Sequence, residues 1–224
     1  MKTVHKLLVF SLVELVAFGL IVFLPAGTFN YWQAWVFLVV VVVSAWIPSI
    51  YLLRKNPAAL QARMRGGPTA ETRMAQKAVV AGLYSSLAAM VVVSVLDHRF
   101  GWSPVPTAIC WVGDVLIAVG LGVVAMVIIQ NSYAAATVRV EAGQKVVSTG
   151  LYGLVRHPMY TGNVIMMVGI PLALGSYWGL LFVVPGVIVL ASRIGDEEKL
   201  LQKELHGYRE YTQKVHHRMV PGMW

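Results

Sequence analysis

The stretch RHPMYTGNVIMMVGIPLALGSYWGLLFVVPGVIVLASR, Arg156–Arg193, contains two apolar runs that are separated by the turn sequence GSYWG. Met159–Leu174 and Trp178–Ser192 are each shorter than the roughly 20 residues of an ordinary membrane-spanning helix, and both contain Gly and Pro. Small residues allow helices to approach closely, and broken helices are tolerated at membrane depth where protein surrounds them. We therefore expect a tight helical hairpin that returns Arg193 to the side from which Arg156 starts.

Further apolar runs precede this hairpin, at about residues 7–24, 31–53, 78–96 and 108–130. In this chain 58% of the residues are hydrophobic and only 12% are charged, whereas roughly a quarter of the residues in soluble domains are charged. The sequence thus predicts an all-α fold, a polytopic integral membrane helix bundle of about five to six transmembrane helices. Its last two helices would be the short hairpin, followed by a C-terminal amphipathic helix.

The net charge of +8 is concentrated in the connections between the apolar runs. The connection between the second and third runs carries six basic residues against a single acid, Glu71: Arg54, Lys55, Arg63, Arg65, Arg73 and Lys77. The positive-inside rule places this connection in the cytoplasm, together with both termini. Because membrane topology accounts for the basic residues, nucleic acid is not an expected partner, whereas membrane lipids are. The six histidines lack the spacing of zinc ligands, so no metal is expected.

Residues Arg156 to Tyr160 form the first candidate site. Pro158 suits the first position of a helix, which puts His157 at the N-cap. The free amide groups of that helix end, with Arg156 beside them, would make an anion-binding corner. Tyr160 lies four residues after Arg156, so the two side chains can face the same way. The alternative is an arginine that pairs with a lipid phosphate beside a capping histidine.

The sequence RIGDEEKL, Arg193–Leu200, closes the last apolar run and forms the second candidate site. Arg193 and Glu197 are four residues apart and can pair on the helix surface. Glu197 and Glu198 point about 100° apart, so at most one of them faces a site. The hairpin brings both candidate sites to one membrane face. S-adenosylmethionine carries the carboxylate, cation and hydroxyls that such a site would suit, while nicotinamide cofactors and lipid head groups stay open.

The C-terminal tail places Leu201, Leu205 and Tyr208 at helical spacing beside basic residues. This pattern predicts an amphipathic helix. Such a helix either lies on anionic lipid or covers a site.

Residues 130–221 resemble the isoprenylcysteine carboxyl methyltransferase family, which are integral membrane enzymes that use S-adenosylmethionine. The resemblance rests on GQKVVSTGLYGLVRHPMYTGN, on Arg193, Glu197, Glu198 and Leu201, and on the ending Gly207, Tyr208, Tyr211, Arg218 and Pro221. Two positions depart from the family pattern: Gln144 stands where many members have histidine, and Leu151 where many have proline.

The resemblance implies that residues 133–224 form the cofactor-binding region and residues 1–132 the N-terminal transmembrane helices of a single membrane domain. It assigns cofactor binding to Gln144, Val146, Val147, Gly150, Tyr152, His157, Tyr160, Glu197 and Glu198. It makes Arg156, Arg193 and Arg218 candidate catalytic residues that hold the methyl acceptor or the cofactor carboxylate. The tail would then cover the cofactor.

The function expected from this resemblance is methyl transfer to a lipophilic acceptor, with an isoprenylcysteine-like carboxylate favoured. Phospholipid amines and small thiols are alternative acceptors. A membrane reductase that uses NADPH on a sterol-like double bond is an alternative enzyme class. A non-enzymatic membrane scaffold is the third possibility.

Overall fold

The fold was analysed in a computed structural model, which describes residues 2–57, 60, 74–131, 133–134, 140 and 143–224. The described residues are helical, with no strand among them. The long helices are α1 (Lys2–Ala26), α2 (Trp32–Lys55), α4 (Met74–Phe100), α5 (Thr107–Gln130), α6 (Pro158–Ala173) and α7 (Val183–Glu204). Shorter helices are η2 (Gly150–Gly153), η3 (Trp178–Phe182) and α8 (Tyr208–Lys214). The predicted all-α fold is confirmed.

Within the described part of the chain, four helical segments are long and apolar enough to cross a membrane: Trp32–Lys55, Gln76–Phe100, Thr107–Gln130 and Trp178–Glu204. The segments Leu15–Ala26 and Pro158–Ala173 are apolar but shorter. Helix α2 leaves Val39, Val43 and Ile47 between 48% and 65% exposed. Apolar surface of this kind marks a face that meets lipid rather than water. The molecule is a helical membrane bundle.

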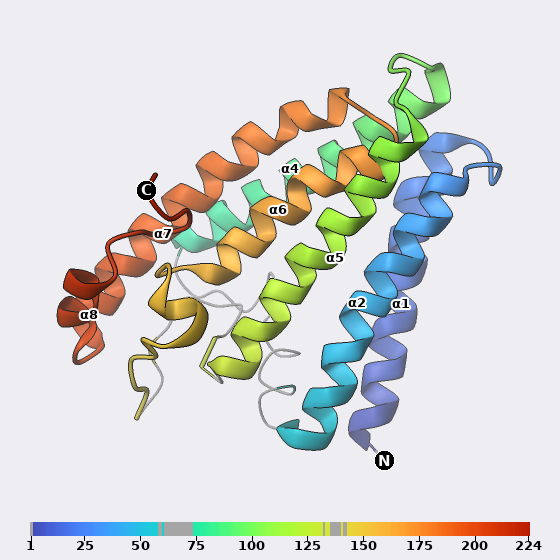
Figure 1. The fold of residues 1–224 in the computed structure, drawn as a ribbon. Helices are drawn as coiled ribbons and strands as arrows, with labels where there is room; N and C mark the ends of the chain where they lie inside the picture. The colour runs from blue at the N-terminus through green and yellow to red at the C-terminus, as the bar shows by residue number, and fades with distance from the viewer. Residues whose placement is uncertain (1, 58–59, 61–73, 132, 135–139, 141–142) are drawn as a thin grey trace.

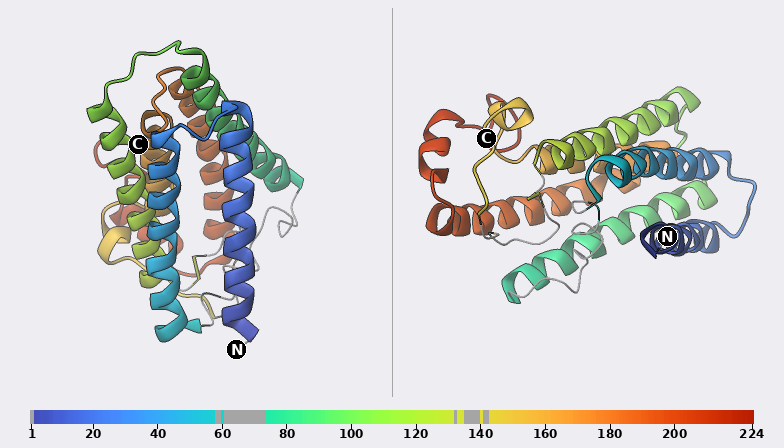
Figure 2. Two further views of the ribbon diagram at one scale, coloured as in Figure 1. Left: turned by 90° about the vertical axis from the view of Figure 1, so that its right-hand side faces the viewer. Right: turned by 90° about the horizontal axis from the view of Figure 1, so that it is seen from below.

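The helices run back and forth along the bundle, as Figures 1 and 2 show. The N-terminus, the end of α2, the end of α5 and the start of α6 lie at one end of the bundle, where α7 also leads into α8 (Figure 1). The hairpin of α6 and α7 therefore returns the chain to the end from which it started, as expected. The cytoplasmic assignment of this end stays a prediction from the basic connections.

Helices α5 and α6 pack with their backbones in contact. A Cβ added to Gly120 would lie 2.5 Å from the carbonyl oxygen of Gly162, and one added to Gly162 would lie 2.7 Å from that of Gly120. Gly113 and Gly169 form a second close approach, because a Cβ on Gly169 would lie 2.7 Å from the Gly113 carbonyl oxygen. Glycine is needed at such positions since any side chain would separate the helices. This packing brings the end of α5 beside the start of α6.

The predicted C-terminal amphipathic helix is interrupted. Helix α7 continues past the apolar run to Glu204, and Gly207 then adopts a positive φ of 83° before α8 begins. The helix ends at its C-cap Leu205, whose backbone is extended (φ −100°, ψ 110°), and Gly207 then adopts the positive φ that glycine takes at the lowest cost. The prediction that Leu201, Leu205 and Tyr208 share one helix is therefore wrong. They nevertheless pack in one cluster with Tyr211 and Val215.

Asp97 joins two turns at the end of the bundle opposite to α8. Its fully buried carboxylate accepts hydrogen bonds from the backbone N–H and the hydroxyl of Ser103, both at 2.7 Å, and from the hydroxyl of Ser176. The Trp178 backbone N–H donates to it at 3.4 Å. Asp97 thus ties the turn after α4 to the turn that joins α6 and η3.

Replacing Asp97 by alanine is expected to lower the free energy of unfolding by about 1–3 kcal/mol, since the half-buried Ser103 and the fully buried Ser176 would lose their acceptor. Thermal unfolding of the purified protein in detergent measures the effect. Ser49→Ala is the control, because that exposed hydroxyl bonds only within its own helix. An Asp97→Ala protein that unfolds at the wild-type temperature would contradict the role of this network.

Candidate functional site

A pocket of about 810 Å³, including its open mouth, lies at the end of the bundle that holds α8. Its walls come from the end of α5, the segment before η2, the start of α6, the end of α7, and α8. The lining residues are Asn131, Tyr133, Ala134, Gln144, Lys145, Val146, Val147, Tyr152, Arg156, His157, Pro158, Met159, Tyr160, Glu197, Leu201, Leu205, Tyr208 and Tyr211. Both candidate sites from the sequence thus meet at one cavity.

The wall around Tyr152 is built by contacts between the end of α5, η2 and α8. The Asn131 side-chain amide donates to the Tyr152 hydroxyl at 3.1 Å, and the Tyr211 hydroxyl donates to the Tyr152 carbonyl oxygen at 2.7 Å. Gly150 starts η2 with a φ of 61°, and a Cβ there would lie 2.9 Å from the side chain of Gln130. Gly150 therefore shapes the backbone that presents Tyr152.

The start of α6 has the predicted local structure, with Pro158 in the first turn and His157 at the N-cap. The C-terminal segment is bound against it. The backbone N–H groups of Arg156 and His157 donate to the carbonyl oxygens of His217 and Arg218, at 2.9 and 2.8 Å. The Thr161 hydroxyl donates to the Met219 carbonyl oxygen at 2.8 Å.

The anion in this corner is a carboxylate of the protein itself, Glu198. Its Oε1 accepts from Arg156 Nε at 2.7 Å and lies 3.2 Å from His157 Nε2, while its Oε2 accepts from Arg218 Nε at 3.0 Å. The Arg156 guanidinium also donates to the carbonyl oxygens of Val215 and His216, at 2.8 and 2.9 Å. Glu198 is only 5% exposed. The corner predicted to bind an anion is thus occupied by Glu198, which joins α6, α7 and the C-terminal segment.

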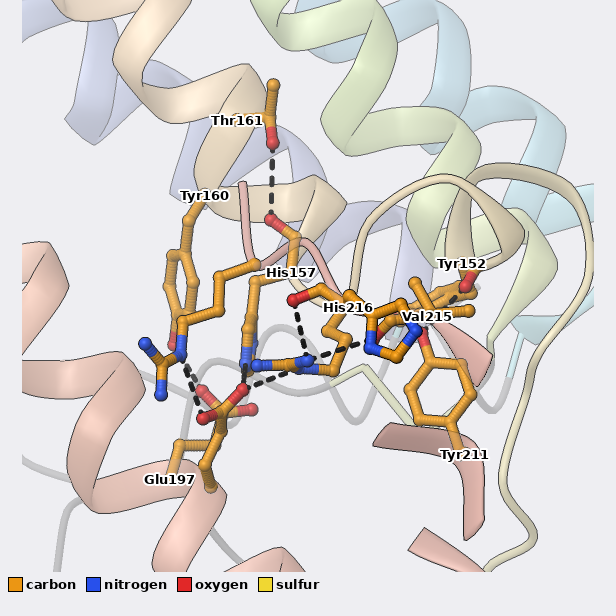
Figure 3. A network of polar contacts seen from close by, with 11 residues as sticks. Tyr152, His157, Tyr160, Thr161, Glu197, Tyr211, Val215 and His216 are labelled. Carbon is orange, nitrogen blue, oxygen red and sulfur yellow. Dashed lines mark hydrogen bonds and ion pairs between the residues drawn. The ribbon is translucent and has the colours of Figure 1, made fainter. Parts of the chain in front are cut away.

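Glu197 faces the pocket instead. Its carboxylate accepts a hydrogen bond from the Tyr160 hydroxyl at 2.7 Å, as Figure 3 shows. Among the residues that the structure describes, no basic side chain forms an ion pair with Glu197. The two neighbouring glutamates therefore differ: one holds the fold together, and the other presents a negative group to the pocket.

The phenols of the pocket remain protonated hydrogen-bond donors. Burial raises the pKa of Tyr208 well above its ordinary value, and the charges of Glu198 and Glu197 add to this. Burial likewise raises the pKa of Tyr211 and of Tyr152. The Tyr208 hydroxyl is buried and has no hydrogen-bond partner within the described part of the chain. A buried hydroxyl without a partner is costly, so a bound ligand that accepts a hydrogen bond from it would remove this cost.

The sequence-predicted residues separate into two groups in the structure. Eight of them line the pocket: Gln144, Val146, Val147, Tyr152, Arg156, His157, Tyr160 and Glu197. Gly150, Glu198, Arg193 and Arg218 lie outside its lining. Of the three candidate catalytic arginines, only Arg156 lines the cavity, and its guanidinium already has three partners in the protein.

Several pocket residues had no assigned role in the sequence prediction. Tyr208 and Tyr211 are three residues apart and share one face of α8, a spacing that helical periodicity identifies once the helix is known. Asn131 follows the last residue of α5, and Leu201 and Leu205 line the wall at the end of α7. The sequence offers no signal for Asn131, because its position matters only after α5 has packed against α6.

The sequence of the helices that build most of this pocket matches the model of a known protein family. Residues 108–207 match the phospholipid methyltransferase family. The match to this methyltransferase family runs from the start of α5 to Gly207, immediately before α8. It therefore includes Glu197, Glu198 and the whole segment from Gln144 to Tyr160, and excludes α1, α2, α4 and the C-terminal segment.

The chain is also similar to a curated protein of a different enzyme class. It is 31% identical over 88 residues to the delta(14)-sterol reductase TM7SF2 of Mus musculus. The aligned part is 38% of this chain and spans 21% of the length of that protein.

Proposed function

We propose that this protein transfers a methyl group from S-adenosylmethionine to a lipophilic acceptor in the membrane. The observation that carries the proposal is the pocket itself. Glu197 lines it within the region that matches a methyltransferase family, and Tyr208, whose buried hydroxyl has no partner among the described residues, lines it immediately after that region. The same pocket holds most of the residues to which the family resemblance assigns the cofactor.

The donor set of the pocket fits S-adenosylmethionine. Its lining combines apolar side chains with a few polar groups, as the lining of small-molecule sites does. Glu197 supplies a negative group for the positively charged part of the ligand, and Tyr208 supplies a donor for an oxygen or nitrogen acceptor. Gln144 supplies an amide that both donates and accepts, which suits an adenine or ribose edge. The apolar surfaces of Val146 and Val147 complete this wall.

When bound, S-adenosylmethionine would supply an electrophilic methyl group on its sulfonium sulfur, for transfer to the acceptor by in-line displacement of the thioether S-adenosylhomocysteine. The protein's contribution is orientation in a site that excludes water. Tyr160 holds the Glu197 carboxylate, and Asn131 and Tyr211 hold Tyr152. Glu198 fixes Arg156 and the C-terminal segment against the start of α6, so that α8 covers the pocket as a lid.

The acceptor that the sequence favours is an isoprenylcysteine-like carboxylate, while the description of the matched family favours a phospholipid. The pocket lies at the end of the bundle that the basic connections assign to the cytoplasm. Transfer of a radiolabelled methyl group from S-adenosylmethionine, assayed against prenylcysteine analogues and purified phospholipids, tests both acceptors directly. Labelled product in neither arm would contradict the proposed reaction on a lipophilic acceptor of these classes.

A reductase is the second candidate function, favoured by the similarity to the delta(14)-sterol reductase. Titration of the purified protein with S-adenosylhomocysteine and with NADPH separates the two. We expect saturable binding of S-adenosylhomocysteine. Saturable binding of NADPH alone would overturn the methyltransferase proposal.

Replacing Tyr208 by phenylalanine is expected to weaken S-adenosylhomocysteine binding by about two- to tenfold, the value of one hydrogen bond. The unliganded protein should be at least as stable as the wild type, because the buried hydroxyl has no partner among the described residues. Calorimetric titration and thermal unfolding measure the two effects. Tyr177→Phe, at an exposed position, is the control. An unchanged affinity in Tyr208→Phe would remove this hydroxyl from the ligand contacts.

A further inference from the structure

We propose that Gln76, in α4, is a positioning residue for Glu197 in the pocket. Gln76 lies outside residues 108–207, and its side chain is fully buried. The inference rests on the proposed function, since the effect of Gln76 is measured through the ligand that the pocket binds. It extends that function to α4, which contributes no residue to the pocket lining.

Gln76 joins α4 to α7 through its side-chain amide. The Gln76 side-chain oxygen accepts from Arg193 Nη1 at 2.8 Å, and its amide nitrogen donates to the carboxylate of Asp196. Both groups of the Gln76 amide are therefore used, one as acceptor and one as donor. An amide whose oxygen and nitrogen are both hydrogen-bonded has one orientation. The Gln76 amide therefore fixes the Arg193 guanidinium that it contacts.

Tyr160 connects Arg193 to the pocket. Arg193 Nε donates to the Tyr160 hydroxyl oxygen at 3.0 Å, and the Tyr160 hydroxyl donates to Glu197 at 2.7 Å. Because Arg193 occupies an acceptor position of the hydroxyl, the hydroxyl proton is directed to Glu197. Figure 3 shows the side chains of Tyr160 and Glu197 extending toward one another from α6 and α7. The path from Gln76 therefore ends on the carboxylate that lines the cavity.

The burial of this network argues for a role beyond joining two helices. Gln76 is 0% and Arg193 only 6% exposed. Placing a charge at such depth is costly, and apolar residues of similar size often join helices at least as stably. The network also explains why Arg193 lies outside the pocket lining: Tyr160 stands between it and the cavity, so Arg193 acts on the site through that hydroxyl.

The test compares Gln76→Met with Lys77→Met, since methionine keeps the length of either chain and Lys77 is the exposed neighbour on the same helix. Wild-type protein is first titrated with S-adenosylhomocysteine. We expect Gln76→Met to weaken this binding by roughly tenfold, within the usual range for coupled residues. Lys77→Met should bind as the wild type does.

A double-mutant cycle with Tyr160→Phe separates positioning from stability. Tyr160→Phe keeps the ring but removes the hydroxyl that joins Arg193 to Glu197. In this background Gln76→Met should weaken binding by less than about twofold, while its effect on the unfolding temperature should persist. Equal losses of affinity in the two backgrounds, or no loss in either, would overturn the positioning role. Failure of the wild-type protein to bind S-adenosylhomocysteine would overturn the proposed function itself.

Discussion

Replacing Glu198 by alanine is expected to lower the free energy of unfolding by about 3–5 kcal/mol, the cost of removing one partner from a buried ion pair. The Arg156 side chain is only 9% exposed and would lose its carboxylate partner. Arg218 would lose the contact that joins the C-terminal segment to α7. Because the same segment holds the lid, we also expect S-adenosylhomocysteine binding to fall below detection. Thermal unfolding and calorimetric titration in detergent measure the two effects.

Two variants make the Glu198 result specific. Glu204→Ala removes an exposed carboxylate from the same helix and should leave unfolding and binding unchanged. Arg218→Ala should be milder than Glu198→Ala, because the Arg218 side chain is 35% exposed and water can replace part of its interactions. A Glu198→Ala protein with wild-type stability and affinity would show that this carboxylate does not hold the site together.

Replacing Gly120 by leucine is expected to prevent assembly of the bundle. Even the first atom of the side chain, Cβ, would lie 2.5 Å from the carbonyl oxygen of Gly162, and backbone cannot move aside as a flexible side chain can. Helices α5 and α6 would have to separate, which would also move Asn131 away from the start of α6. The expected result is loss of the monodisperse peak in size-exclusion chromatography after detergent extraction.

Gly122 provides the matched control on the same helix, since nothing lies within 4 Å of an added Cβ there. Gly122→Leu should therefore be extracted and purified as the wild type is. Gly120→Ala is the milder test, with an expected destabilisation of about 1–3 kcal/mol from overpacking. If Gly120→Leu and Gly122→Leu behaved alike, close contact between the two backbones would not be required for assembly.

Much of the helical architecture could be predicted from the sequence because it depends on local properties. The length and polarity of each apolar run decide whether a segment can cross a membrane, and these are read along the chain. The position of Pro158 in the first turn of α6 follows from its missing N–H and its fixed φ. The interruption between Leu205 and Gly207 was not predicted, since the pattern of Leu201, Leu205 and Tyr208 has the same spacing with or without the break.

Eight of the twelve predicted site residues line the pocket, but their arrangement was not predicted. Helix geometry alone indicates that Glu197 and Glu198 point in different directions, and only Glu197 lines the pocket. Which of the two would do so depends on the rotation of α7 against α6. An anion-binding corner at Arg156 also followed from the sequence. Its partner, a glutamate 42 residues later in the chain, did not.

The sequence by itself determined the membrane helices, the shared end to which the hairpin returns, and the residue types that could bind a cofactor. The tertiary structure alone decided that Glu198 neutralises the arginines, that Glu197 faces the cavity, and that Gln76 reaches the site from α4. The physical reason is the separation along the chain between the residues that interact. Helix formation and membrane insertion depend on neighbouring residues, whereas a buried hydrogen bond depends on the packing and rotation of helices far apart in the chain.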